Sequence, residues 1–211
     1  MGNGTIKEAR LGFAERCLRY FSYAVIHLVQ RPKLMSPLTP LGEPTIFACR
    51  HVGLIDPVIL MVCYFRKMVR PLVAKDYYDV SNFTRKFYRT AQCIPLDRRN
   101  PSKQWLEESL AALEKGESVL IFPEGKRNKT GEGLLPFHHG AALLALRSGA
   151  RIVPVYNAVW KFPHRYRLAT GAPLYLQAPA PGEDEAQWLK DQTARIQQAV
   201  AELAPIVEGK R

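Results

Sequence analysis

The chain has 211 residues, 47% of them hydrophobic, which is enough to bury one sizeable core but leaves two independent domains cramped. Lys and Arg number 30 against 19 Asp and Glu, so the formal charge of +11 predicts an anionic partner: a nucleic acid, an anionic bilayer or an acidic carrier. The four cysteines form no CxxC pair, which argues against a zinc or dithiol site and favours reduced thiols in a cytosolic compartment.

The first regular pattern lies near the N-terminus. Apolar residues recur there at spacings of three and four and predict an amphipathic helix: Leu11, Ala14, Leu18, Phe21, Val25 and Leu28. Several arginines and lysines lie along or beside this stripe. The apolar run Tyr20–Val29 is about half of what a membrane-spanning helix needs, and no secretory leader pattern is recognised. The stripe has two interpretations: packing on the core, or binding at an anionic membrane surface.

From Pro44 onward, short β-rich runs alternate with helical patterns, which predicts an α/β fold with a mostly parallel sheet flanked by helices. The expected strands are 45–50, 70–74, 93–96, 118–122 and 151–156, followed by a hairpin around Gly171 with arms near 165–169 and 173–177. Pro154 argues against a central place for the 151–156 strand, because proline cannot donate to the ladder. We divide the chain into an N-terminal helix and linker, residues 1–40, and an α/β domain, residues 41–211.

Helix signals fall between these strands. Asp56-Pro57 reads as an N-cap followed by proline in the first turn, and predicts a helix to about Lys67. Further helices are predicted over 101–115, over 140–148 and over about 183–203. Gly116 and Gly149 stand where the first two of these should end.

Charged or reactive clusters follow the carboxyl ends of four predicted strands. They are His51, Lys75, Asp97-Arg98-Arg99 and Glu124-Gly125-Lys126-Arg127. In open α/β sheets, ligands bind at that edge. The arrangement favours one shared site over four unrelated surface features.

His51 and Asp56 are five positions apart across a predicted strand-to-helix turn. An aspartate that accepts a hydrogen bond from one imidazole nitrogen fixes the tautomer and leaves the other nitrogen free to take a proton. No serine or cysteine stands in a nucleophile motif such as GxSxG, which favours direct attack by a substrate hydroxyl over a covalent acyl-enzyme. By itself, the pair does not separate a catalytic base from an ordinary strand-end histidine beside a capping aspartate.

The segment from Phe122 to Asn128 places a carboxylate, a glycine and two cations directly after an apolar strand. Arginine suits bidentate phosphate binding, and glycine lets the backbone approach a ligand. A basic surface turn would have the same composition.

Together these segments resemble the glycerolipid acyltransferase family, specifically its bacterial-type 1-acyl-glycerol-3-phosphate acyltransferases. The family's HxxxxD block matches 51–56, its apolar strand ending in Asp-Arg is similar to 94–98, its FPEGTR block to 122–128, and its apolar run around proline to 152–155. A segment in which the family keeps a lysine is similar to 73–75. The matches occur in the family's order.

This resemblance implies that His51 is the general base on the acceptor hydroxyl and that Asp56 orients it. The residues expected to bind the acceptor's glycerol phosphate are Arg98, Glu124 and Arg127, with Lys75 a further candidate and Gly125 and Lys126 beside them. The donor would be an acyl thioester of coenzyme A or acyl carrier protein, with no bound cofactor and no metal. The resemblance also favours docking of the N-terminal helix, peripherally, at the cytoplasmic face of an anionic membrane.

Three departures from the family pattern bear on the acceptor. Lys126 and Asn128 replace the usual threonine and serine, and Gln92 stands where glycine is common. His138-His139 occupies a place where the family often has lysine, and we interpret both histidines as site-edge or surface residues.

The expected reaction is acyl transfer to 1-acyl-glycerol-3-phosphate, giving phosphatidic acid in phospholipid biosynthesis. Alternatives are another lysolipid acceptor, such as lyso-ornithine lipid or a lysophospholipid, and a thioesterase that uses water. A nucleic-acid-binding module is disfavoured, because no binding motif appears and the cations lie at strand ends.

Overall fold

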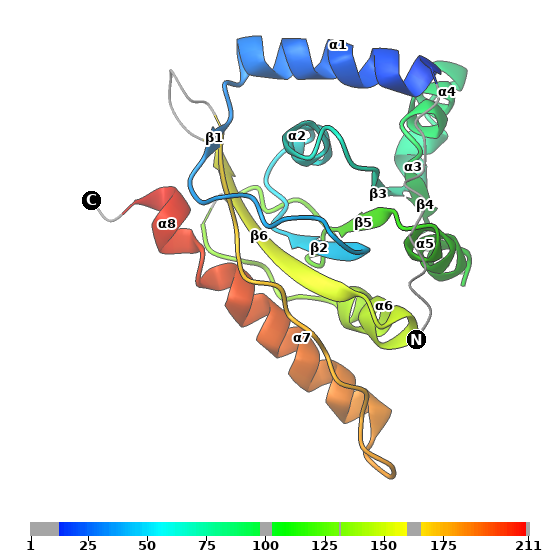
Figure 1. Cartoon of the computed structure of the whole chain (residues 1–211), viewed down its shortest axis with the longest axis vertical. Helices are drawn as coiled ribbons and strands as arrows, with labels where there is room; N and C mark the ends of the chain where they lie inside the picture. The colour runs from blue at the N-terminus through cyan, green and yellow to red at the C-terminus, as the bar shows by residue number, and fades with distance from the viewer. Residues whose placement is uncertain (1–12, 98–102, 131, 160–165, 210–211) are drawn as a thin grey trace.

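The computed structural model describes residues 13–97, 103–130, 132–159 and 166–209 (Figure 1). Within these ranges seven strands form one sheet in the order β1-β7-β6-β2-β5-β3-β4. The strands are β1 (Lys33–Leu34), β2 (Thr45–Cys49), β3 (Val69–Ala74), β4 (Ile94–Leu96), β5 (Ser118–Ile121), β6 (Arg151–Val159) and β7 (Tyr166–Thr170). Every neighbouring pair is parallel except β6 with β7. The prediction of a single α/β domain with a mostly parallel sheet is confirmed.

Helices cover both faces of this sheet (Figure 1). They are α1 (Phe13–Val29), α2 (Asp56–Cys63), α3 (Lys75–Tyr78), α4 (Asn82–Thr90), α5 (Gln104–Glu114), α6 (Gly140–Ser148), α7 (Glu185–Ala201) and α8 (Ala204–Glu208). Helices α5, α6 and α7 pack on one face, and α2 packs on the other with α1 above it. The division at residue 40 stays a prediction, although β1 already places two residues of the first segment at the sheet edge.

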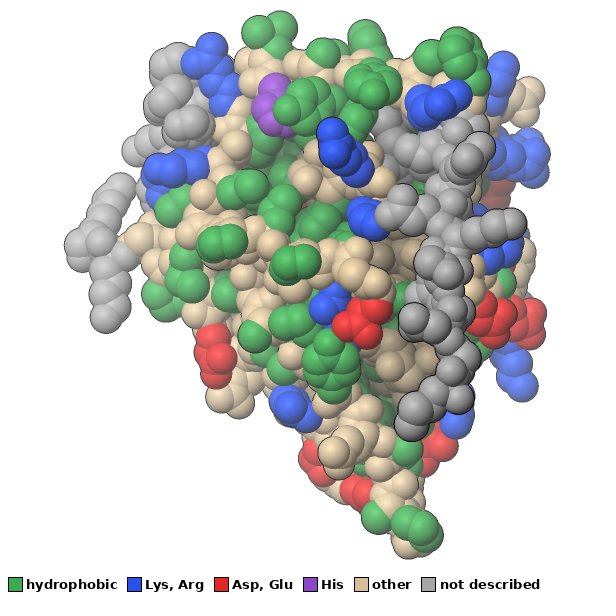
Figure 2. Space-filling view, viewed as in Figure 1, with side chains coloured by type: hydrophobic (Ala, Val, Ile, Leu, Met, Phe, Trp, Pro, Cys, Tyr) green, Lys and Arg blue, Asp and Glu red, His purple; other side chains and the backbone are tan. Residues whose placement is uncertain are grey.

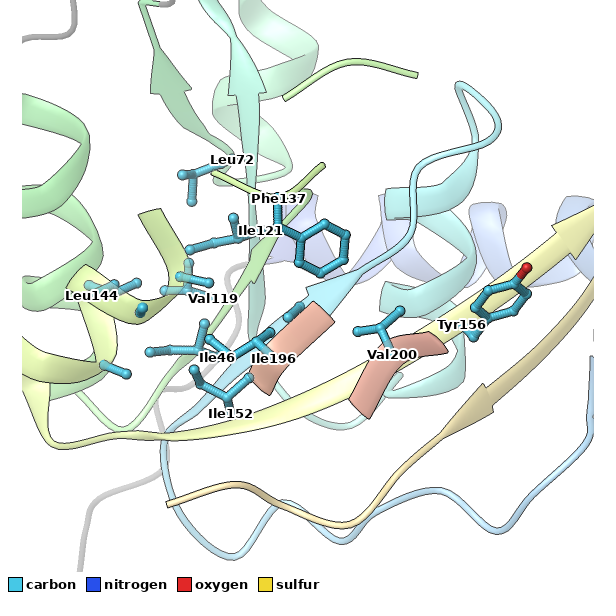
Figure 3. Close-up of a cluster of buried hydrophobic side chains, with 14 of the residues drawn as sticks. Ile46, Leu72, Val119, Ile121, Phe137, Leu144, Ile152, Tyr156, Ile196 and Val200 are labelled. Carbon is cyan, nitrogen blue, oxygen red and sulfur yellow. The ribbon is translucent and has the colours of Figure 1, made fainter. Parts of the chain in front are cut away.

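The central strands explain why this sheet needs two helical layers. Strands β2 and β5 are buried along their whole length, and apolar runs without polar alternation are typical of parallel strands covered on both faces. Successive side chains point to opposite faces, so Ile46 joins the core against α6 and α7 while Phe47 joins the core against α2. Figure 3 shows the first of these cores, where Ile46, Val119 and Ile152 meet the side chains of the covering helices.

Strand β6 lies between β2 and β7, so the expectation that Pro154 would keep it from the centre of the sheet is wrong. The Pro154 carbonyl accepts a hydrogen bond from the Gly171 N–H at 2.9 Å. Within a strand, one residue's N–H and C=O point to the same side. The Pro154 nitrogen, which has no hydrogen to donate, therefore faces Gly171, just beyond the end of β7. The hydrogen bonds between β6 and β2 are not affected.

The predicted hairpin around Gly171 is also wrong. Strand β7 pairs with β6, and Leu174 continues along the same edge by bridging Ile152. Gly171 therefore lies in a segment that runs past Pro154 rather than in a reversing turn. A Cβ at Gly171 would approach the Pro154 side chain to 2.8 Å, so glycine is needed there for close backbone approach.

The helix predictions hold with four corrections. Helix α6 has the predicted bounds and ends at Gly149 in the left-handed conformation. Helix α2 ends at Cys63 rather than Lys67, and Asp56 is its first helical residue rather than a cap outside it. The C-terminal segment forms two helices instead of one, and α3 and α4 occupy a stretch to which no helix was assigned. Within the described ranges, no helix combines the length and the apolar character needed to cross a bilayer.

Candidate active site

Four of the parallel strands bring their carboxyl ends to one edge of the sheet, in the order β2, β5, β3, β4. The segments that begin at His51, Lys75, Asp97 and Glu124 leave the sheet there, as predicted from the strand ends. Arg98 lies outside the described residues. The order of the strands therefore brings these segments to one edge of the sheet. The positions of their side chains determine which of them share a site.

His51 and Asp56 form the centre of the site. The imidazole Nδ1 lies 2.9 Å from the Asp56 Oδ2, and the Asp56 side chain is fully buried while that of His51 is 19% exposed. The same carboxylate oxygen accepts from the backbone N–H groups of Val52 at 2.7 Å and Gly53 at 2.9 Å. These two hydrogen bonds fold the connecting loop over the Asp56 carboxylate, and the fold of the loop brings His51, five residues earlier, into contact with it.

The second carboxylate oxygen of Asp56 is held from another part of the chain. Oδ1 accepts from the Tyr166 hydroxyl at 2.8 Å, and the Asn157 side-chain amide donates in turn to that hydroxyl. Tyr166 and Asn157 are both buried. Burial and the Asp56 charge raise the pKa of Tyr166 well above its usual value, so the hydroxyl stays protonated and acts as the donor. Sequence reasoning missed this residue, because only the β6–β7 pairing brings it to the site.

Tyr166→Phe should therefore destabilise the protein. It removes a buried hydrogen bond to a carboxylate, worth about 1.5–3 kcal/mol, and leaves the Asn157 amide without its acceptor. We expect a lower midpoint of urea unfolding and a reduced acyl-transfer rate at temperatures where the variant is folded. Tyr175→Phe is the matched control, since it loses an exposed hydrogen bond to Glu43. Equal unfolding midpoints for the two variants would show that the Tyr166 hydroxyl does not stabilise the fold.

The Glu124 carboxylate connects the His51 loop to the 122–135 segment. It is 1% exposed; Oε1 accepts from the His51 backbone N–H at 2.9 Å, and Oε2 accepts from the Leu135 N–H at 3.1 Å. Burial raises the pKa of Glu124, and these two hydrogen bonds and the charge of Arg50 oppose the shift. A direct contact between Glu124 and the acceptor stays a prediction; in the structure, both oxygens already have backbone donors.

The residues after Glu124 form one wall of the site. Gly125 has a φ of 66°, and a Cβ there would come within 2.9 Å of the His138 ring, so a larger residue would be strained. Lys126 is exposed and Arg127 half-buried. The Asn128 side-chain amide donates to the carbonyls of Glu132 and Gly133, and the Asn128 backbone N–H donates to the His51 carbonyl. Asn128, which replaces the family's usual serine, therefore helps to hold this loop in its conformation.

A cavity of about 670 Å³ opens beside these groups. His51, Gly125, Lys126 and Arg127 line it together with the ring of Phe122, which stacks on the imidazole at 4.2 Å between ring centroids. Most of the remaining lining is apolar and comes from α1, α2, β3, α4 and the turns that follow α2 and α4: Leu18, Pro57, Val58, Met61, Val62, Phe65, Pro71, Leu72, Val73, Ala74, Phe87, Tyr88 and Ala91. The structure thus combines a histidine, three cations (Lys126, Arg127 and Lys129) and an apolar chamber.

Lys75 is not part of this chamber. It lines a separate hollow of about 400 Å³ with Arg70, Arg85 and Arg89, although it follows the strand end as predicted. The structure therefore brings His51, Lys126 and Arg127 to one cavity and places Lys75 elsewhere. A role for Lys75 in acceptor binding stays a prediction.

The buried cysteines are poorly suited to nucleophilic catalysis. Burial raises the pKa of Cys63 and of Cys93 to about 12, and burial together with the charges of Asp56 and Glu124 raises that of Cys49 well above its usual value. A thiol attacks as its thiolate, which these groups do not form near neutral pH. Among the described residues, no group of three His, Cys, Asp or Glu side chains is arranged to hold a metal ion. Whether the reaction proceeds without metal stays a prediction.

The sequence model of the family described as Acyltransferase matches residues 27–158, and the chain belongs to this family. The family identified from the motifs is thereby confirmed.

Relatives within the family carry a more specific name. A 1-acyl-sn-glycerol-3-phosphate acyltransferase of Cocos nucifera is 34% identical over 113 residues, which make up 52% of this chain and 36% of the relative. One of the same name from Pseudomonas aeruginosa is 29% identical over 125 residues, 54% of this chain and 48% of the relative. The matches thus span less than half the length of both relatives.

A solved structure shows the same fold over more of the chain. It is the 1-acyl-sn-glycerophosphate (LPA) acyltransferase PlsC from Thermotoga maritima, with a TM-score of 0.64 and 16% sequence identity. The superposition covers 93% of this chain and 80% of that one.

Proposed function

We propose that the protein is an O-acyltransferase that moves a fatty acyl chain from an acyl thioester to the free hydroxyl of 1-acyl-glycerol-3-phosphate, giving phosphatidic acid. The observation that carries the proposal is the His51–Asp56 pair at the wall of a largely apolar cavity that three cationic residues also line. The names of the relatives support this choice of acceptor.

The geometry suggests the following chemistry. Asp56 accepts from Nδ1–H, so Nε2 carries a lone pair, and no hydrogen-bond partner of Nε2 is found among the described residues. The acceptor hydroxyl loses its proton to Nε2 as its oxygen attacks the thioester carbonyl. The tetrahedral intermediate then expels the thiolate, to which the imidazolium returns the proton. No acyl-enzyme is needed.

The cavity suits the remaining parts of the two substrates. Its apolar lining fits acyl chains, and Arg127 offers a planar guanidinium for the acceptor's phosphate. The donor is then an acyl thioester of coenzyme A or acyl carrier protein. The cation Lys126 beside Arg127 is unusual for the motif and is compatible with another acceptor, such as lyso-ornithine lipid or a lysophospholipid.

The test is product analysis by mass spectrometry, with an acyl thioester and a panel of lyso-acceptors. We expect phosphatidic acid as the main product and little thioester consumption when the acceptor is omitted. A different acylated lipid would reassign the acceptor. Consumption that does not depend on any acceptor would identify a thioesterase and overturn the proposal.

We further propose that α1 holds the enzyme peripherally at the cytoplasmic face of the membrane. Three residues of the predicted stripe face away from the protein: Phe21 is 69%, Val25 39% and Leu28 74% exposed. Ile26, on the other side of the helix, is 7% exposed and packs in the core with α2. This exposure favours the membrane interpretation of the stripe over core packing.

Changing Phe21 and Val25 to Asp should therefore release the protein from anionic liposomes, and added salt should weaken binding of the unmodified protein by screening its cations. Co-sedimentation with phosphatidylglycerol-containing liposomes measures both effects. Tyr175→Asp, at an exposed aromatic residue far along the chain, serves as the control. Unchanged sedimentation after both treatments would mean that α1 does not dock the protein.

A further inference from the structure

The segment that leads from β3 toward β4 exposes large apolar side chains. Val80 is 70% exposed and Phe83 78%, while Phe87 is 36% exposed and borders the cavity. Phe83 does not belong to a frayed end. Ser81 and Thr84 form a reciprocal capping box that fixes the first turn of α4, and this holds Phe83 outward.

The same helix is strongly basic. Arg85, Lys86 and Arg89 lie on α4, which contains no acidic residue. Asp79, just before the helix, pairs with Arg85 at 3.2 Å, and Arg89 faces the hollow that contains Lys75, so Lys86 is the cation beside the apolar face. Lys86 is three residues beyond Phe83 and so lies next to it on the helix surface. Apolar side chains flanked by cations are the pattern of helices that lie in a membrane interface.

This surface continues that of α1. Helix α4 contacts α1 and lies at its N-terminal end, where Phe13 is 77% exposed (Figure 1). Figure 2 shows apolar side chains along the upper edge of the molecule, over α1 and toward α4, with lysine and arginine side chains beside them. The cavity lies between the two helices, since Leu18 of α1 and Phe87 of α4 both line it.

We propose that residues 80–87 form a second membrane contact, seated on the same anionic phospholipid bilayer as α1. Val80 and Phe83 enter the boundary between headgroups and acyl chains, and Lys86 binds a lipid phosphate. The inference rests on the docking of α1 proposed above. If α1 alone bound the membrane, the protein could rotate about the axis of α1. Two contacts on either side of the cavity orient the opening of the cavity toward the bilayer, so that a lipid can enter without crossing water.

A fluorescent label tests where residue 83 lies. Cys17 on α1 is exposed, whereas Cys49 is buried and Cys63 and Cys93 are partly buried with raised pKa values, so thiol reagents at neutral pH should react chiefly with Cys17. A Cys17→Ser/Phe83→Cys protein carries an NBD label at α4, and Cys17→Ser/Tyr175→Cys carries it on a distant exposed surface. Vesicles of phosphatidylcholine with phosphatidylglycerol should increase and blue-shift emission from position 83 but not from position 175.

Substitutions test whether the contact contributes to binding. Phe83→Asn together with Val80→Asn introduces no charge, and should weaken vesicle binding roughly tenfold or more, because it removes two apolar side chains from the interface. Tyr175→Asn is the control and should bind normally. Phe83→Leu, which keeps an apolar group, should retain most of the binding. Far-ultraviolet circular dichroism shows whether α4 and the fold persist.

Three outcomes would overturn the inference. The first is an aqueous emission spectrum at position 83 while a label on Cys17 reports an apolar environment. The second is unchanged vesicle binding by the folded double variant. The third is an apolar signal at position 83 without vesicles, accompanied by dimers in analytical ultracentrifugation, which would assign the surface to self-association. None of these measurements involves acyl transfer. Failure of the membrane contact can therefore be distinguished from failure of the proposed reaction, which the product assay tests.

Discussion

His51→Ala is expected to reduce acyl transfer by about 10²- to 10⁴-fold, the usual contribution of a general base, without a comparable loss of folding. Among the described residues that line the cavity, the His51 imidazole has one ring nitrogen bonded to a buried carboxylate and the other without a partner. The ring itself is partly exposed, and its removal leaves the Asp56 carboxylate with three further donors: the backbone N–H groups of Val52 and Gly53 and the Tyr166 hydroxyl. The turnover number should therefore fall by orders of magnitude, while the melting temperature changes little.

The comparison needs a histidine outside the site. His139→Ala is suitable, because His139 is exposed and contacts Thr193 rather than the cavity. Initial rates with saturating acceptor and donor, with melting temperatures measured on the same preparations, separate chemistry from folding. If the folded His51→Ala variant kept more than about a third of the unmodified rate, another group would be the base.

The approach of His51 to Asp56 could be predicted from sequence, because it is built within one turn. A strand end, a loop of four residues and a helix start leave few arrangements, and the carboxylate closes the loop through the Val52 and Gly53 N–H groups. The strand ends were also predictable, since the short apolar runs before each cluster mark buried parallel strands. Local signals therefore located both the sheet edge and its central pair.

Contacts between distant segments could not be predicted in this way. Tyr166 reaches Asp56 only because β7 runs antiparallel to β6, and Glu124 reaches the His51 backbone only because β5 lies next to β2. Strand order is not encoded in spacing. The same limitation explains Lys75, which follows the correct strand end but faces a different hollow.

The surface helix α4 was missed for another reason. Its Asn, Thr, Tyr and Phe residues are weak helix formers, and no apolar stripe faces the core. Its start is instead fixed by the Ser81–Thr84 capping box, a signal that lacks the usual acidic residue at the third position. Exposed Phe83 likewise gives no burial pattern to recognise.

Arg127→Ala should reduce use of the lyso-acceptor by roughly ten- to a hundredfold, because a guanidinium bound to phosphate contributes a charge-assisted hydrogen bond of about 1.5–3 kcal/mol. Arg127 is half-buried in the cavity wall that contains His51, and Glu124, three residues earlier, ties its loop to the His51 backbone. If the contact acts equally in the ground and transition states, the acceptor KM rises; if it also aligns the hydroxyl beside Nε2, kcat falls too.

Steady-state kinetics with both substrates varied distinguishes this role from a general effect of charge. Arg127→Lys keeps the charge but loses the planar fork, so it should recover activity only partly. Arg195→Ala removes an exposed cation from α7 and should leave both KM values unchanged. The donor KM of Arg127→Ala should also change little. A defect confined to the donor, or none at all, would move Arg127 from the acceptor's phosphate to the thioester carrier or to the membrane surface.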